Sequence, residues 1–181
     1  MQIGILALQG AFIEHSQVLD KLGIKNFEIR QKKDILKPFD GLILPGGEST
    51  AQLKLLHDLE LFEPLKEKIQ NGLPTLGICA GMILLCEHFQ TISAKVKRNA
   101  YGRQLGSFFC TAEFNGEPIP MSFIRAPLII DIGKATPLAQ VNSDIVAAQE
   151  NNQLICAFHP ELHTDVVHKY FAAFIGEKNA K

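Results

Sequence analysis

The sequence predicts a three-layer α/β fold with a mainly parallel sheet and added antiparallel strands. Two observations carry this prediction: strands alternate with helices through the first half of the chain, and two hairpin patterns follow in the second half. Strand–helix alternation implies right-handed βαβ units, and these place the strands side by side in a parallel sheet. With 181 residues and no repeat or linker, residues 1–181 are expected to form one domain.

Most strands of the first half are expected at short apolar runs, two of which end at glycine or proline. Such runs are typical of parallel strands that are buried on both faces. These strands are expected at residues 3–8, 26–30, 41–44 and 76–78. Helical patterns lie between them, and Gly23 and Gly72 follow two of these patterns as helix ends often require. The helices are expected at residues 11–22, 49–71 in two segments, and 81–89.

The second half carries two hairpin signals. Asn115-Gly116 separates apolar stretches at 107–114 and 119–124, and this dipeptide favours a tight hairpin turn. The polar segment 150–153 likewise separates the stretches 145–149 and 154–158. These strands are expected to join the same sheet in antiparallel fashion, followed by a last helix over 164–174.

Composition and charge exclude several classes of partner. The formal net charge of −1 gives no reason to expect binding to nucleic acid or to an anionic membrane. No apolar run approaches the ~18 residues of a membrane span, and the first ten residues lack the basic start of a secretion signal. The four cysteines form no C-x-x-C pair, which is typical of free thiols in a reducing cytoplasm.

The segment Gly77-Ile78-Cys79-Ala80-Gly81 has the form of a nucleophile elbow between a strand and a helix. The turn in such an elbow is sharp, so a side chain at either flanking position would clash with neighbouring backbone. The positive end of the following helix would favour a reactive thiolate. A buried core cysteine beside a packing glycine remains an alternative at this point.

A cysteine nucleophile needs a base, and His159 at the end of the 154–158 strand is the candidate. Glu161 follows two residues later and could accept the imidazole N–H, as the acid does in a catalytic triad. The other helical histidines, His15, His57, His88 and His168, are expected to face solvent.

The pattern HPELH also places two histidines four residues apart, as in a zinc site. Pro160 directly after His159 opposes the helix that such a site needs, so no metal site is expected.

The turn Leu44-Pro45-Gly46-Gly47-Glu48-Ser49-Thr50 lies at a strand end before a helix. It lacks the spacing and the lysine of a phosphate-binding loop. It is either a simple turn with Ser49 as helix N-cap or, beside a nucleophile, a source of an N–H group for an oxyanion. Ala80 N–H would then be the second donor.

The motifs ALQGAFIEH, LILPGGEST, GICAGM, NAYGRQ, FIRAP and FHPEL together resemble the class I glutamine amidotransferases. More closely, they resemble the glutaminase subunits of pyridoxal 5′-phosphate synthase, and the resemblance spans nearly the whole chain. It implies a flavodoxin-like amidotransferase fold and a glutaminase that needs no cofactor. In such a glutaminase Cys79 attacks the carboxamide carbon of L-glutamine, His159 moves the proton, and Glu161 orients His159.

The resemblance also implies a binding site and a partner. Gly47 would serve the oxyanion together with Ala80. The residues that would hold glutamine are Gly46, Gly47, Glu48, Arg103, Ile124 and Arg125. The ammonia would pass to the synthase subunit, which is a (β/α)₈ barrel that makes vitamin B6. Gln9 would take part in switching on the glutaminase when the two subunits dock. Two alternatives stay open: another cysteine-dependent hydrolase of the DJ-1 type, and a regulatory protein that has kept only the fold.

Overall fold

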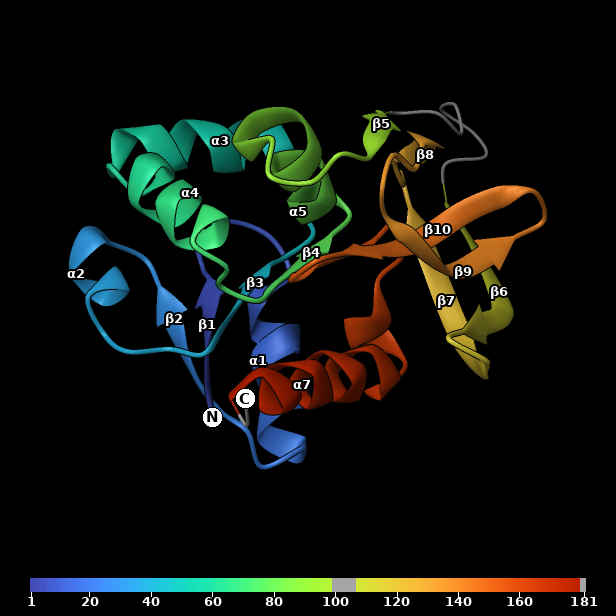
Figure 1. Ribbon diagram of the computed structural model, residues 1–181, viewed down its shortest axis with the longest axis horizontal. Coiled ribbons are helices and arrows are strands. Elements are labelled where there is room, and N and C mark those ends of the chain that lie inside the picture. The colour runs from blue at the N-terminus through green and yellow to red at the C-terminus, as the bar shows by residue number, and fades with distance from the viewer. Residues whose placement is uncertain (99–106, 180–181) are drawn as a thin grey trace.

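The computed structural model describes residues 1–98 and 107–179 of the chain. Within these residues, nine strands form one sheet in the order β2-β1-β3-β4-β11-β10-β9-β6-β7. Helices cover the sheet on both faces, so the molecule has three layers (Figure 1). The predicted fold class is therefore confirmed.

The parallel half of the sheet consists of β2, β1, β3, β4 and β11. β1, β3, β4 and β11 are almost wholly buried, as the apolar runs of the sequence predict for strands covered on both faces. Their bounds are β1 Gln2–Leu6, β2 Lys25–Ile29, β3 Gly41–Leu44, β4 Thr75–Ile78 and β11 Gln153–Cys156. Because the strands run parallel, the residues that follow β3, β4 and β11 meet at one edge of the sheet.

The antiparallel half continues the same sheet with β10, β9, β6 and β7. Asn115 and Gly116 connect β6 to β7 with φ of 49° and 84°, the left-handed backbone of a two-residue hairpin turn. β10 and β11 form the second hairpin, so both predicted hairpins are confirmed. β11 also pairs in parallel with β4, whereas the sequence predicted only antiparallel strands in this half of the chain. The bounds are β6 Ser107–Phe114, β7 Glu117–Ile124, β9 Thr136–Val141 and β10 Asp144–Glu150.

The helices divide between the two faces. α1 (Phe12–Lys21) and α7 (Val166–Asn179) lie on one side of the sheet, and α3 (Ser49–Asp58), α4 (Phe62–Gln70) and α5 (Ala80–Ile83) lie on the other (Figure 1). α1 and α7 come from opposite ends of the chain, so their packing brings the two ends against the same sheet.

The sequence did not predict four short elements: α2 (Lys32–Ile35), β5 (Lys95–Lys97), β8 (Leu128–Asp131) and β9. β5 and β8 pair only with each other in a small second sheet, and β9 has mostly exposed or half-buried residues, so none carries a clear apolar pattern. The helix predicted at 81–89 is also different. It changes after Ile83 into a π-helix, Leu84–Phe89, a form that often occurs near functional sites.

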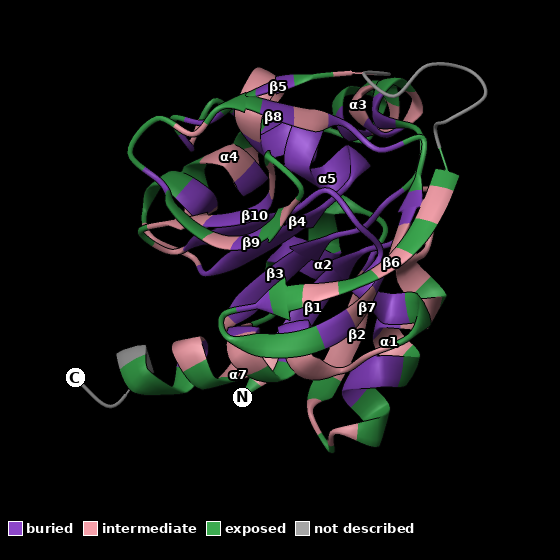
Figure 2. Cartoon of the chain, turned by 90° about the vertical axis from the view of Figure 1, so that its right-hand side faces the viewer, coloured by how far each residue is buried: buried purple, intermediate pink, exposed green. Residues whose placement is uncertain are grey.

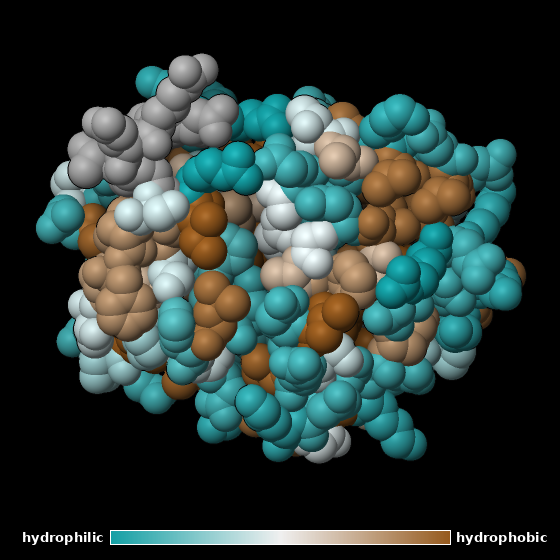
Figure 3. Space-filling model, turned by 180° about the vertical axis from the view of Figure 1, so that it is seen from behind, coloured by the Kyte–Doolittle hydropathy of each residue, from teal (hydrophilic) through white to brown (hydrophobic). Residues whose placement is uncertain are grey.

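Burial is concentrated in the strands of the parallel half and in α5, whereas the outer faces of the helices are exposed (Figure 2). On the surface seen from behind, apolar side chains occur in separate groups among hydrophilic ones (Figure 3). Across residues 1–98 and 107–179, no helix has the length and apolarity needed to span a membrane.

Candidate active site

Cys79 lies at a strained turn between β4 and α5. Its φ is 48°, a left-handed conformation that L-residues adopt at a cost of order 1–3 kcal/mol. Its N–H donates to the carbonyl of Cys156 at 2.8 Å, which ties the turn to the end of β11. A core cysteine has no need of this conformation. The geometry is that of a nucleophile elbow.

The two flanking glycines allow the elbow to pack. A Cβ on Gly77 would stand 2.7 Å from the side chain of Leu85 and 2.9 Å from the backbone of Gly81. A Cβ on Gly81 would overlap the carbonyl oxygen of Leu44 and stand 2.7 Å from its carbonyl carbon. Both glycines are therefore required by close approach of the backbone, which brings α5 against the ends of β3 and β4.

Cys79, His159 and Glu161 meet at this edge of the sheet. His159 Nδ1 lies 2.6 Å from Glu161 Oε1, and the Cys79 thiol is near enough to the imidazole to raise its pKa. The backbone N–H of His159 donates to Ser122 in β7 at 2.8 Å, and Glu161 lies in a single 3₁₀ turn, Pro160–Leu162. Three elements far apart in sequence thus fix a Cys–His–Glu arrangement.

The surroundings of His159 favour its charged form. Burial alone lowers the pKa of an imidazole, but hydrogen bonds with Cys79 and Glu161 and the charge of both partners outweigh it and raise the pKa to about 10. His159 therefore holds a proton at neutral pH, as a group that must later protonate a leaving amine requires.

His163 does not share a site with His159. Its Nε2 lies 2.8 Å from Ser122 Oγ, and its ring packs edge-on against Phe109. The zinc interpretation of HPELH thus has no support from the geometry. Over residues 1–98 and 107–179, no group of three or more histidine, cysteine or acidic side chains could hold a metal ion.

The glycine loop after β3 lies against both the nucleophile and the base. A Cβ on Gly46 would overlap the imidazole of His159 and stand 3.0 Å from its Nδ1, so only glycine permits this packing. Gly47 lines the cavity beside Cys79 with φ of 156°. The N–H of Glu48 donates to Gln9 Oε1 at 2.7 Å, and this contact fixes the present conformation of the loop.

A cavity of about 200 Å³ opens at Cys79. This volume is smaller than the ~300–1,000 Å³ that is typical of pockets for drug-sized ligands. It suits a ligand the size of one amino acid. Its lining consists of Gly47, Glu48, Ser49, Cys79, Ala80, Ile83, Arg98, Ile124, Arg125 and Pro127. Most of the predicted substrate residues therefore line one cavity, together with the two predicted oxyanion residues.

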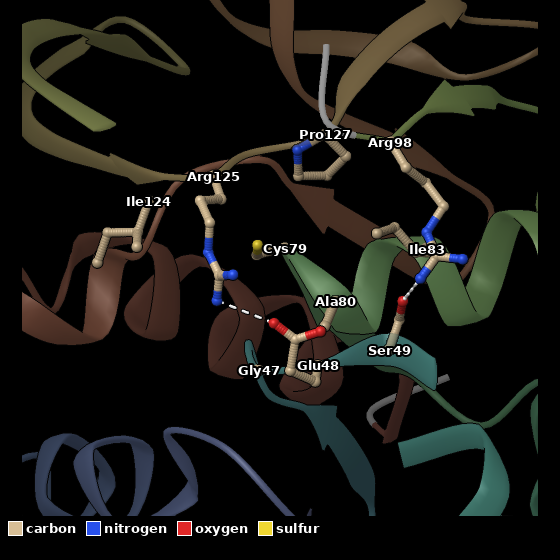
Figure 4. Close-up of a pocket in the computed structure, with 10 residues that line it drawn as sticks. All are labelled: Gly47, Glu48, Ser49, Cys79, Ala80, Ile83, Arg98, Ile124, Arg125 and Pro127. Carbon is tan, nitrogen blue, oxygen red and sulfur yellow. Dashed lines mark hydrogen bonds and ion pairs between the residues drawn. The ribbon is translucent and has the colours of Figure 1, made fainter. Parts of the chain in front are cut away.

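Two arginines face this cavity from opposite sides of Cys79 (Figure 4). Arg125 Nη2 lies 2.9 Å from Glu48 Oε1, and Arg98 Nη2 donates to Ser49 Oγ. Arg98 is a residue that the sequence reasoning missed. Arg103, which the resemblance named instead, lies outside the described residues. The available signal for Arg98 was its position in the sequence, five residues before Arg103.

Two of the histidine predictions are wrong. His57 is exposed and His88 is half-buried, but His15 and His168 are completely buried, and His15 lies against Glu161 rather than in solvent. Their helices, α1 and α7, are the two that cover the same face of the sheet. The pairing of these helices was invisible in the local sequence pattern.

Comparisons with known proteins show the family of this chain. The model of the SNO glutamine amidotransferase family matches residues 5–177. A protein of Methanocorpusculum labreanum named pyridoxal 5′-phosphate synthase subunit PdxT is 52% identical, over 99% of this chain and 100% of that relative. A protein of Haemophilus influenzae with the same name is 53% identical, over 94% of this chain and 96% of that relative.

Solved structures give the same result for the fold. One, described as a glutamine amidotransferase, superposes with a TM-score of 0.88 at 35% identity, over 96% of this chain and 98% of its own. A putative GMP synthase component of Thermoplasma acidophilum superposes with a TM-score of 0.74 over 99% of this chain and 96% of its own. At 20% identity this second likeness concerns the fold alone.

Proposed function

The chain belongs to the SNO glutamine amidotransferase family, and from that premise we propose that it is the glutaminase subunit of a pyridoxal 5′-phosphate synthase. It hydrolyses L-glutamine to L-glutamate and ammonia, and the ammonia serves vitamin B6 biosynthesis. One observation carries the proposal: Cys79, His159 and Glu161 converge at one end of the sheet, and Cys79 lines a cavity of about 200 Å³.

The reaction begins with the thiolate of Cys79, which attacks the carboxamide carbon of glutamine. The carbonyl oxygen becomes an oxyanion, and the backbone N–H groups of Gly47 and Ala80, which both line the cavity, are the proposed donors that stabilise it. Protonated His159 gives its proton to the departing nitrogen, so ammonia leaves and a γ-glutamyl thioester remains on Cys79. His159 then takes a proton from water, and the resulting hydroxide cleaves the thioester and expels Cys79 as the thiolate. The γ-carboxyl group formed gives its proton to the released ammonia, so glutamate leaves and the starting state is restored.

Glu161 keeps His159 in the orientation that this cycle requires. Its carboxylate accepts the Nδ1–H of His159, so Nε2 is the nitrogen left for Cys79 and the leaving group. The carboxylate also stabilises the imidazolium form. This role of Glu161 is orientation and charge compensation, not proton transfer.

The charged side chains of the cavity match the two ends of an amino acid. Arg98 presents a planar guanidinium to the substrate α-carboxylate, and Glu48 presents a carboxylate to the α-ammonium group. Glu48 and Arg125 are at least half exposed, and such surface ion pairs contribute only ~0–1 kcal/mol. Glutamine can therefore replace the Glu48–Arg125 contact at little cost. Gly46, Ile124 and the 103 position complete the proposed binding set.

The partner is a synthase subunit with a (β/α)₈ barrel, and the compartment is the cytoplasm. The family resemblance supports the barrel, and the free state of Cys79, Cys86, Cys110 and Cys156 suits a reducing compartment. In the isolated chain Gln9 holds the N–H of Glu48, next to the oxyanion loop. We propose that docking of the synthase rearranges this loop and switches on hydrolysis.

The test is to mix the chain with such a barrel and measure glutamate release and ammonia-dependent formation of pyridoxal 5′-phosphate. Both activities are expected in the mixture, and both should disappear with Cys79→Ala. A DJ-1-type hydrolase or a purely regulatory protein would leave glutamine unchanged in the mixture. Unchanged glutamate release by Cys79→Ala would refute the mechanism.

A further inference from the structure

Two histidines lie directly behind Glu161, on the side away from His159. His15 of α1 and His168 of α7 both have no exposed surface. His15 Nδ1 and His168 Nε2 are 2.8 Å apart, a hydrogen-bond distance. His15 Nε2 lies 3.7 Å from Glu161 Oε2, the carboxylate oxygen that His159 does not use.

Both facing atoms lack another partner. Within residues 1–98 and 107–179, neither His15 Nε2 nor Glu161 Oε2 makes a hydrogen bond, although both are buried. A buried polar atom without a partner is costly, of order 1–3 kcal/mol, so native proteins rarely retain one without a function. The 3.7 Å gap is too long for a hydrogen bond. Hydrogen bonds within an active site often tighten when the substrate is bound.

The two imidazoles are uncharged. Burial lowers the pKa of His168 to about 4, and burial with the neighbouring histidines holds the pKa of His15 well below its usual value. A neutral imidazole has one N–H group and one acceptor nitrogen. The direction of the hydrogen bond between His168 and His15, that is the order of donors, therefore decides whether His15 points an N–H group or a lone pair at Glu161.

Only one order suits every contact. If His168 Nε2–H donates to His15 Nδ1, then His15 carries its proton on Nε2 and points an N–H at Glu161 Oε2. In the opposite order a nitrogen lone pair of His15 would face a carboxylate oxygen, which is repulsive. The first order leaves each oxygen of Glu161 facing an N–H group.

We propose that His15 and His168 are positioning residues for the hydrolysis: His168 fixes the tautomer of His15, and the N–H of His15 holds Glu161 in place against His159. This inference rests on the proposed function for its catalytic meaning, though not for its geometry. Outer partners that orient a histidine or its carboxylate typically change activity by ~10–100-fold when removed from comparable metal sites. The same logic applies to the carboxylate here.

The first test needs no turnover. In the free chain labelled with ¹⁵N at histidine, NMR chemical shifts of the ring nitrogens report which nitrogen of each imidazole carries the proton. The expected result is that His15 and His168 are both protonated on Nε2 at neutral pH. A His15 ring protonated on Nδ1, or a charged ring at either position, would overturn the proposal.

The second test compares His15→Leu with His15→Gln in the mixture with the synthase barrel. Glutamine can place an amide N–H where Nε2 of His15 stands, and leucine cannot. We expect His15→Leu to lower kcat for glutamate release ~10–100-fold with KM within about twofold, and His15→Gln to recover most of kcat. Equal losses in both variants, no loss in His15→Leu, or a change in KM alone would contradict a positioning role.

The two tests separate the inference from the proposed function. If the wild-type mixture releases no glutamate, the proposed function fails, and the NMR result still decides the tautomer order. If His15→Leu does not fold, His168→Leu and His168→Gln give the same comparison one step further from Glu161, with a smaller expected loss of kcat in the leucine variant. An unchanged kcat in His168→Leu would then refute the role of His168 in fixing the tautomer of His15.

Discussion

Gly81→Ala tests the reason for the glycines around the nucleophile. A Cβ at this position would stand 2.7 Å from the carbonyl carbon of Leu44, about 0.8 Å short of the ~3.5 Å optimum for carbon atoms. The obstacle is backbone in β3, not the end of a flexible side chain. Because the carbonyl oxygen of Leu44 is closer still, the start of α5, and Cys79 with it, must move by about an ångström or more.

The cost follows from that displacement. Overpacking a core usually costs ~1–3 kcal/mol, and a clash with backbone belongs at the upper end, about 3 kcal/mol. In a chain of this size 1 kcal/mol corresponds to ~2–4 °C in Tm, so Gly81→Ala should melt about 6–12 °C lower. Because a 1 Å misplacement of a reacting group can cost ~10²-fold in rate, glutamate release should fall by about that factor even in the folded fraction.

Gly176→Ala is the matched control for Gly81→Ala. Gly176 is an exposed residue of α7, and a Cβ there would meet nothing within 4 Å. Alanine in a helix interior is more stable than glycine by ~0.5–1 kcal/mol, so this variant should melt slightly higher with unchanged activity. The reasoning is refuted if Gly81→Ala matches wild type in Tm and in glutamate release.

Arg98→Ala should raise KM for glutamine by about 10-fold or more with a smaller effect on kcat, because it removes the guanidinium that faces the substrate carboxylate; a change in kcat alone would contradict this role. Glu161→Gln should lower kcat by about 10³-fold, since an amide cannot stabilise the His159 imidazolium, and a loss below threefold would exclude the triad. The free energy of unfolding, measured by denaturant titration across pH, should peak near pH 6.5. Between pH 6.5 and about pH 10 the free energy of unfolding falls as the pH rises, because His159 keeps its proton in the folded chain and loses it in the unfolded chain. Between pH 6.5 and about pH 4 it falls as the pH drops, because His168 binds a proton in the unfolded chain and stays neutral in the folded chain. His159→Gln should flatten only the alkaline limb, and an unchanged alkaline limb would show that another group is responsible.

The sequence predicted the parallel strands because strands buried on both faces need continuous apolar runs, and residues 41–44 and 76–78 have them. It also indicated Cys79, since a thiol between two glycines at a strand end has the form of a nucleophile elbow, although the sequence left a buried core cysteine as an alternative. His159 and Glu161 could be paired with Cys79 because His159 was expected at a strand end, where open α/β sheets carry their ligand sites. That β11 runs parallel to β4, which brings these residues to Cys79, was not predicted.

The rest depends on contacts that no local pattern contains. His15 and His168 are 153 positions apart, and each lies in an ordinary helical pattern, so only the packing of α1 and α7 on one face shows that they meet. Arg98 lies after a three-residue strand, β5, whose partner β8 is almost as short. Nothing in such short elements indicates that Arg98 will line the cavity.

The most direct test of the central claim is to look for the covalent intermediate on Cys79. The chain is mixed with the synthase barrel and glutamine, quenched in acid within the first turnovers, and digested for mass spectrometry. The account predicts a γ-glutamyl thioester on the peptide that contains Cys79, and none in Cys79→Ala. Glutamate release without any adduct on Cys79 under conditions that preserve thioesters, or an adduct on a different residue, would contradict it.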